Sequence, residues 1–190
     1  MTKRIDLLAS GSGTLAQAII SAVKSGSLDL EIVRIISDRP AQVLNRANEN
    51  DIESTLLDYS RFSSREEWGS ELERIIDTDR VDLVVSVGFM RILPKKIVEK
   101  FSIINTHPAL LPNFPGAHAV RDALTAGVNE TGTTIHWVDA GVDTGKVISQ
   151  VRIAVEHGDT QDSLHERIKI QERFLIVETL KQFATAGLEK

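Results

Sequence analysis

The residues best suited to chemistry lie in one short stretch, where an asparagine and a histidine are separated by a single residue. Asn105 and His107 follow the apolar residues 103 and 104, and side chains two apart on an extended chain point to the same side. An amide can donate a hydrogen bond to an oxygen that becomes negative during acyl transfer, and an imidazole can stabilise or protonate that oxygen. The spacing therefore indicates acyl transfer, with a buried histidine beside a structural turn as the alternative.

A stiff loop follows this pair. Three of the chain's five prolines fall at Pro108, Pro112 and Pro115, and Gly116 comes next. Proline ends a strand because it has no N–H for the ladder, and a stiff loop loses little entropy when it holds one shape. Open α/β sheets bind ligands at the carboxyl ends of their strands, so we expect a binding site here.

Two further loops carry groups that could join this site. Residues 10–14 read S-G-S-G-T between an apolar strand at 4–9 and a helix, with Thr14 as the expected N-cap. Glycines that let backbone N–H groups approach, together with a helix N-terminus, form a phosphate site, with a plain tight turn as the alternative. The loop 139–145 contributes Asp143, whose carboxylate would orient a nearby imidazole and raise its pKa.

Strand and helix patterns alternate through residue 105, which favours an open parallel sheet with right-handed crossovers. The apolar loop 88–94 indicates either core packing or the wall of a pocket for a flat ligand. We expect Ser63 and Glu66 to form a capping box. The expected strands span 4–9, 31–37, 54–57, 81–87, 103–105, 133–138 and 147–155, and the expected helices span 15–23, 41–49, 63–76, 95–100, 119–126 and 159–184.

Length and composition narrow the class of protein. At 190 residues the chain can bury its own core, and we expect one domain. The absence of cysteine rules out disulfides and thiolate metal sites, and the histidines lack the spacing of a metal motif. A net charge of −5 argues against nucleic acid, and no apolar run suits a signal peptide or membrane span, so a cytoplasmic protein is expected. Without cysteine or a G-x-S-x-G motif, direct transfer to a bound nucleophile is preferred to a covalent acyl-enzyme.

Five blocks together resemble the folate-dependent formyltransferase family, most closely its members that formylate phosphoribosylglycinamide in purine biosynthesis. The blocks are S-G-S-G-T, G-F-M-R-I-L, N-T-H-P-A-L-L-P-N-F-P-G-A-H, G-T-T-I-H-W-V-D-A-G-V-D-T-G and I-S-Q. Their order and spacing match over nearly the whole chain. The resemblance implies an α/β fold, an open, mostly parallel Rossmann-like sheet of about seven strands with helices on both faces, and one formyltransferase domain over residues 1–190.

The resemblance also implies a reaction and its site residues. The amine of 5′-phosphoribosylglycinamide would attack the formyl carbon of 10-formyltetrahydrofolate, the formyl-donor cosubstrate, without a metal. Asn105 and His107 would stabilise the oxyanion, and Asp143 would keep His107 charged and help relay the proton. The residues expected to bind phosphoribosylglycinamide are Gly13, Thr14, Leu15, Lys169 and Glu172. The residues expected to bind the folate are Arg65, Met90, Arg91, Ile92, Leu93 and Asn105. Partners are then small molecules, with no nucleic acid or membrane, and a homodimer is an open alternative to a monomer.

Two positions depart from the family pattern. Leu15 stands where asparagine is common, so only its backbone N–H remains for a phosphate. Lys146 replaces a common proline after the D-x-G block, where it would alter the loop that carries Asp143 or simply face solvent. Neither departure changes Asn105, His107 or Asp143.

Three alternatives stay open. The pattern G-x-G-x-x-A at 11–16, with Asp38 at the end of the next strand, fits a dinucleotide-binding module or dehydrogenase, but it leaves Asn105 and Asp143 without a role. Methionyl-tRNA formyltransferase would need a further C-terminal domain and a basic surface for tRNA. Formyltetrahydrofolate deformylase would need an N-terminal regulatory domain, for which a first strand at residue 4 leaves no room.

Overall fold

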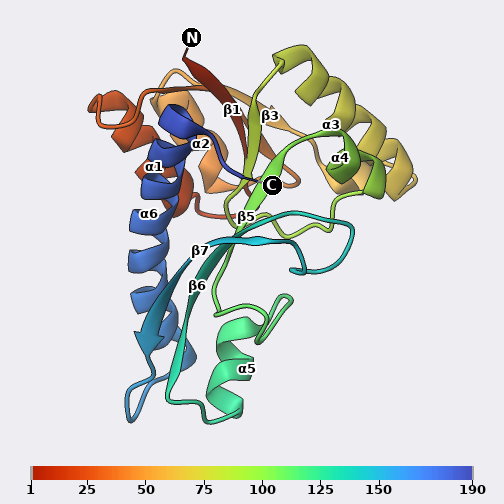
Figure 1. The fold of residues 1–190 in the computed structure, drawn as a ribbon. Coiled ribbons are helices and arrows are strands. Elements are labelled where there is room, and N and C mark those ends of the chain that lie inside the picture. Colours follow the sequence, from red (N-terminus) through yellow and green to blue (C-terminus); the bar gives the residue numbers. More distant parts are fainter. Residues whose placement is uncertain (1, 190) are drawn as a thin grey trace.

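The central strands are apolar on both faces, as strands covered by helices on two sides must be. The computed structural model describes residues 2–189, which build one seven-stranded sheet in the order β3-β2-β1-β4-β5-β6-β7 (Figure 1). Strands β1 to β5 run parallel, and β6 is antiparallel to both β5 and β7. This confirms the expected open, mostly parallel α/β sheet. The strands are β1 (Lys3–Leu8), β2 (Leu30–Ser37), β3 (Glu53–Leu56), β4 (Leu83–Ser86), β5 (Ile103–His107), β6 (Glu130–Trp137) and β7 (Val147–Ala154).

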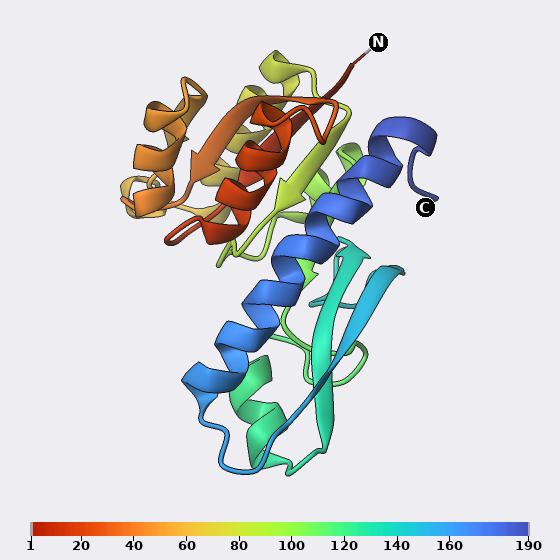
Figure 2. The same cartoon turned by 90° about the vertical axis from the view of Figure 1, so that its left-hand side faces the viewer.

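Helices cover both faces of this sheet, as expected. One apolar core joins α1, α2 and the C-terminal half of α6 to one face, and Figure 2 shows α6 lying beside α1 along that face. A second core joins α3 and α4 to the opposite face around the fully buried Trp68. The helices are α1 (Thr14–Lys24), α2 (Gln42–Glu49), α3 (Arg65–Asp79), α4 (Lys95–Lys100), α5 (Ala119–Thr125) and α6 (Gln161–Ala186). None of the helices within residues 2–189 is long and apolar enough to cross a membrane.

Two expected helix starts are wrong by one residue. Thr14 is the first residue of α1, and Gly13 is its N-cap, with a left-handed φ of 71° that glycine adopts without steric cost. Ser64, not Ser63, caps α3 by accepting from the Glu67 N–H at 3.1 Å. Glu67 accepts from the N–H of Ser63 rather than from that of Ser64, so the expected reciprocal capping box does not form.

A third core ties the short helix α5 to the start of α6. Val120 packs with Leu164 and Ile168 of α6 and with Ile153 of β7. Thr160 caps α6 in a capping box with Ser163, which fixes where this helix begins. The first turns of α6 and the whole of α5 therefore form one packed unit beside the antiparallel strands.

A buried acid stands in the middle of β1. Asp6 is fully buried opposite Arg34 of β2, and Arg34 already donates to both carboxyl oxygens of Asp79, at 2.7 and 3.0 Å. Neither carboxyl oxygen of Asp6 has a hydrogen-bond partner within the described chain. Burial first, and the nearby Asp79 charge second, raise the pKa of Asp6 to about 8. Folding therefore favours protonated Asp6, and ionisation of this group destabilises the fold.

We expect Asp6→Val to stabilise the protein increasingly as the pH rises. A raised folded-state pKa means that wild-type stability falls between about pH 4 and about pH 8, whereas a valine has no proton to lose. The variant should gain at least ~1 kcal/mol in free energy of unfolding over this interval, measured by urea unfolding at several pH values. Asp29→Asn, at an exposed position, should keep the wild-type pH dependence. A gain that is the same at every pH would contradict this account.

Candidate active site

A cavity of about 600 Å³ opens where three neighbouring parallel strands end. Residues that directly follow β1, the loop 88–93 after β4, and the end of β5 all line it. The strand order reverses between β1 and β4, which is where open α/β sheets bind ligands. A second hollow of about 720 Å³, between β3 and α3, contains none of the expected site residues. The site expected from the sequence therefore coincides with the cavity at the strand ends.

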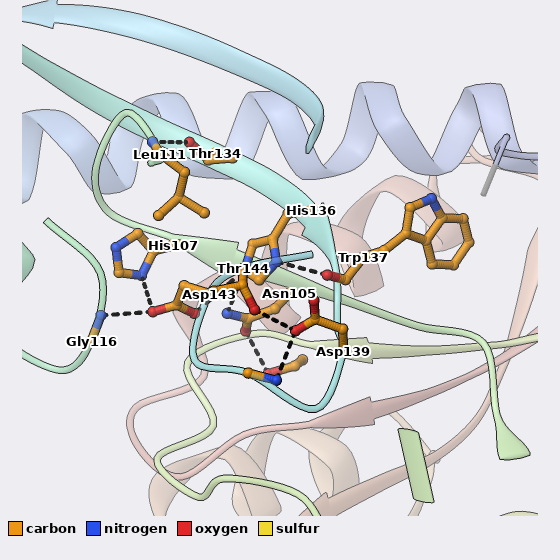
Figure 3. A network of polar contacts seen from close by, with 12 residues as sticks. Asn105, His107, Leu111, Gly116, Thr134, His136, Trp137, Asp139, Asp143 and Thr144 are labelled. Carbon is orange, nitrogen blue, oxygen red and sulfur yellow. Dashed lines mark hydrogen bonds and ion pairs between the residues drawn. The ribbon is translucent and has the colours of Figure 1, made fainter. Parts of the chain in front are cut away.

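Asn105 lies at the bottom of this cavity with its amide held in one orientation. The Ser86 hydroxyl donates to Asn105 Oδ1 at 2.7 Å, so the amide nitrogen points the other way. That nitrogen lies 3.3 Å from His136 Nε2, and His136 is fixed in turn because its Nδ1 lies 2.8 Å from the Trp137 carbonyl oxygen, which can only accept (Figure 3). One amide N–H thus donates to His136, and the other is available for a ligand oxygen.

His107 is buried, and both of its ring nitrogens face oxygen atoms. Nε2 lies 2.8 Å from the Phe114 carbonyl, which can only accept, so Nε2 carries a proton. Nδ1 lies 3.3 Å from Asp143 Oδ2. Burial lowers the pKa of His107 below its ordinary value, against the opposing effects of Asp143 and the Phe114 carbonyl. Asp143 thus acts on the pKa of His107 in the expected direction, but the burial of the ring acts in the opposite direction and is the larger effect.

Asp143 joins the two histidines. Its Oδ2 accepts from the Gly116 N–H at 2.7 Å, and its Oδ1 lies 3.5 Å from His136 Nε2 (Figure 3). Burial acts to raise the pKa of Asp143, but His136, the Gly116 N–H and His107 together hold that pKa below its ordinary value. Asp143 is therefore an anion at neutral pH.

The backbone is strained at two places in this cluster. Phe114 has φ of 54° and Asp143 also has φ of 54°, in the left-handed region that non-glycine residues adopt at a cost. The Phe114 carbonyl accepts from His107, and the Asp143 carboxylate faces the same ring. Such strain, on the order of 1–3 kcal/mol for each residue, persists only where the surroundings determine the conformation. Here the surroundings orient the acceptors on both sides of one imidazole.

The loop that carries Asp143 is closed by a second aspartate and a glycine. Asp139 Oδ1 accepts from the Thr144 hydroxyl at 2.7 Å and from the Gly141 N–H at 3.0 Å. A Cβ at Gly145 would lie 1.7 Å from the Trp137 carbonyl oxygen, so only glycine allows this return of the chain. These contacts fix the loop independently of any ligand.

The glycine loop lies at the opposite wall of the cavity, with Gly13, Thr14 and Leu15 among its lining residues. No side chain caps the N-terminus of α1, so its first N–H groups remain open to a ligand. A Cβ at Gly13 would lie 2.5 Å from Val43 Cγ2, which means that packing on α2 requires this glycine as well. The site residues expected here are thus in place, although Gly13 also has a structural role.

The apolar loop 88–93 forms another wall, and its Met90 and Ile92 side chains are 62 % and 59 % exposed. Its position is set by Asp38, which is buried at the end of β2 and accepts from Arg91 at 2.7 Å and from Arg39 at 2.9 Å. Arg91 also stacks over Tyr59, with its guanidinium carbon 4.2 Å from the ring centroid. Because two arginines occupy the Asp38 carboxylate, it is not free to bind a ribose, which disfavours a dinucleotide-binding module.

The remaining expected residues differ in their relation to the cavity. Lys169 and Glu172 line it from α6, and Leu93 lines it from the loop after β4. Arg65 is not among the lining residues; it donates to the Leu93 carbonyl at 2.8 Å and so anchors the end of the loop. Burial raises the pKa of Glu172 to about 7. Residues 2–189 contain no group of three or more His, Cys, Asp or Glu side chains placed to hold a metal ion.

Sequence reasoning missed the supporting part of the network. Ser86 orients Asn105, and His136 bridges Asn105 and Asp143, yet neither was expected in the site. The signal for His136 was present, since it lies two residues after Thr134 on an alternating strand and directly opposite Asn105 in the β5–β6 register. That register could be assigned only once the antiparallel pairing was known.

Comparisons with known proteins agree with this geometry. A family model described as formyl transferase matches residues 3–180. The chain is 40 % identical over 187 residues to the phosphoribosylglycinamide formyltransferase of Mycobacterium tuberculosis, covering 97 % of this chain and 86 % of that protein. The crystal structure of the phosphoribosylglycinamide formyltransferase from Bacillus halodurans superposes with a TM-score of 0.92 at 38 % identity, covering 97 % and 96 % of the two chains. That of glycinamide ribonucleotide transformylase 1 from Symbiobacterium toebii gives 0.93 at 38 % identity, covering 96 % and 88 %.

We expect Asp143→Asn to lower the pKa of His107 further. Burial already lowers it, and the substitution removes the carboxylate that opposes burial while keeping the side-chain shape. The His107 ring protons, followed by NMR during a pH titration, should therefore shift at a lower pH in the variant. The ring signals of His157, which is exposed and lies outside the cavity, serve as an internal control. Identical His107 titrations would show that the two side chains are not coupled.

Proposed function

The chain belongs to the formyl transferase family, and from this premise we propose that it transfers the formyl group of 10-formyltetrahydrofolate to the amine of 5′-phosphoribosylglycinamide, a step of purine biosynthesis. The observation that carries the proposal is the meeting of Asn105, His107 and Asp143 in one cavity, between a glycine loop and an apolar loop. The relatives at 38–40 % identity are named for this activity, and the similarity covers 86 % and 96 % of their chains.

The two walls suit the two substrates. Backbone N–H groups at Gly13, Thr14 and Leu15 fit the phosphate of the ribonucleotide, with Lys169 and Glu172 facing it from α6. The exposed apolar side chains of the loop 88–93 fit the flat pterin of the folate. Arg65 holds the end of this loop by donating to the Leu93 carbonyl. In this arrangement the formyl carbon and the amine meet beside Asn105.

The reaction forms a bond between the glycinamide nitrogen and the formyl carbon, and breaks the bond from that carbon to N10 of the folate. Negative charge develops on the formyl oxygen in the tetrahedral intermediate, where the free N–H of Asn105 donates to it. Ser86 and His136 hold that amide in place beforehand, so little reorganisation accompanies the charge.

The attacking amine must lose a proton, and N10 must gain one. The Asp143 carboxylate is ionised, so it would accept the proton of the amine and return it to N10 as the bond from the formyl carbon to N10 breaks. His107 Nδ1 lies 3.3 Å from the same carboxylate, so a proton on Nδ1 would make an imidazolium whose two N–H groups both meet oxygen acceptors. Direct donation from His107 to the oxyanion would require the ring to leave the Phe114 carbonyl.

We further infer that residues 1–190 act as one formyltransferase domain in the cytoplasm, with small molecules as ligands and 10-formyltetrahydrofolate as cosubstrate. The family match from residue 3 to residue 180 and the single sheet support one domain. The net charge of −5 supports small-molecule ligands over nucleic acid. A homodimer stays an alternative to a monomer.

A two-substrate assay tests the reaction. Tetrahydrofolate and formylated ribonucleotide should appear together, at equal rates, only when both substrates are present. Asp143→Asn should lower kcat by at least ~100-fold, the low end for a lost acid–base group, with little change in either KM. Asp139→Asn, in the same loop but outside the proton path, should keep a larger kcat than Asp143→Asn. Release of formate without the ribonucleotide would instead favour a deformylase.

Amide hydrogen exchange with and without each ligand tests which substrate binds at each wall. It needs no substitution at Gly13, which would disturb the packing on Val43. A folate analogue should slow amide hydrogen exchange in the loop 88–93, because it would bury that exposed apolar segment. The ribonucleotide should slow exchange in residues 13–15 at the start of α1. Protection of the same residues by both ligands would contradict the assignment of one wall to each substrate.

A further inference from the structure

The cavity extends past the expected phosphate site along the N-terminal half of α6. Gln161, His165, Lys169 and Glu172 recur at intervals of one helical turn, and all four line the cavity. Glu172 is the member nearest to the antiparallel strands, where its carboxyl group meets Thr133 of β6 at 3.5 Å. The first two turns of α6 therefore present a polar wall that the expected substrate contacts leave without a role.

Helix α5 closes this end of the cavity and adds positive charge. His118 and Arg121 line the cavity at the start of α5, which is packed on α6 through Val120. Acidic groups nearby hold the cations in the unliganded protein: Glu166 accepts from Lys169 at 2.7 Å, and Asp122 accepts from Arg121 at 3.0 Å. The two cations at this end of the cavity are therefore each balanced by an acidic neighbour in the unliganded protein.

Like that of Gln161, the side chain of His165 makes no hydrogen bond to any other residue between 2 and 189. It is partly buried, and burial followed by the charge of Lys169 lowers its pKa below the ordinary value, against Glu166 and Asp162. The other titratable groups lining this end are His118 and Arg121 of α5. A dianion bound here would raise the pKa of His165, because it would favour the imidazolium form.

At residue 15 the glycine loop lacks a side-chain donor for a phosphate, and this wall can supply one. Leu15 has an apolar side chain, so the loop offers a phosphate backbone N–H groups at residues 13–15 but no side-chain donor from that position. Tight binding of a phosphate monoester usually combines such N–H groups with charge-assisted bonds from basic side chains. Lys169 and His165 are the basic side chains that α6 directs into the same cavity.

We propose that His165 is a further substrate-binding residue, which together with Lys169 holds the phosphate of the ribonucleotide from the α6 side. The proposal rests on the function proposed above. His165 accepts a proton as the phosphate binds, so ribonucleotide binding takes up protons near neutral pH. The loop 88–93, the proposed folate wall, shares no residue with this wall, so we expect folate binding to be unaffected.

The test compares His165→Gln with His157→Gln, an identical change at an exposed histidine outside the cavity. His165→Gln should raise KM for the ribonucleotide about tenfold, with kcat and the folate KM unchanged, because a charge-assisted bond to the phosphate is lost. The same variant should leave KM for the dephosphorylated riboside unchanged. The difference from wild type should shrink from about pH 6 to about pH 9, as His165 loses its proton. His157→Gln should behave like the wild type.

Two outcomes would overturn the proposal: an unchanged KM for the ribonucleotide, or an equal rise for the ribonucleotide and the riboside. Calorimetric titration with ribose 5-phosphate tests phosphate binding by His165 separately from formyl transfer, because the measurement needs no turnover. Wild-type protein should bind about tenfold more tightly than His165→Gln, and only the wild type should show a heat that depends on the ionisation enthalpy of the buffer. Equal binding by both proteins would exclude His165 from the phosphate site even if formyl transfer fails.

Discussion

The antiparallel pairing of β5 with β6 is the constraint on which the site depends. It sets Asn105 directly opposite His136, and a slip of one residue would turn both side chains to the other face of the sheet. The chain then leaves β6 and must return past the Trp137 carbonyl, which it can do only because residue 145 is glycine. Asp143 lies on that return, so one strand pairing and one close backbone approach bring its carboxylate to the histidines.

The parallel and antiparallel parts of the sheet contribute different chemistry. The carboxyl ends of β1 and β4 supply loops that fit ligands through backbone N–H groups and apolar side chains. The antiparallel strands, the loop between them and α6 supply the side chains of His136, Asp143 and Glu172. Asn105 and His107 end the last parallel strand, at the junction of the two parts. A reacting centre at this junction can meet ligands from both sides.

Sequence predicted the fold class and the positions of the site residues well, because both depend on local signals. Alternating strands and helices, and Asn105 two residues before His107, are readable within a few residues. The features that sequence did not predict depend on contacts between residues far apart in the chain, or on how deeply a side chain is buried. Ser86 and His136 enter through strand pairing, and the buried charge of Asp38 meets Arg91 from 53 residues away. Asp143 acts to raise the pKa of His107, as expected, but no local pattern reveals how deeply that imidazole is buried.

The two carboxyl groups of the cavity show how burial and partners together assign roles. Both are desolvated, yet the pKa of Asp143 is lowered while that of Glu172 is raised to about 7. The difference lies in their partners: Asp143 has two imidazoles and the Gly116 N–H, whereas between residues 2 and 189 the Glu172 carboxyl group has one hydrogen bond, a 3.5 Å contact with Thr133. Asp143 is thus ready to accept a proton, and Glu172 can still carry one and donate it to a ligand oxygen. Environments that give two acids different pKa values in this way allow one to transfer a proton and the other to bind substrate within one cavity.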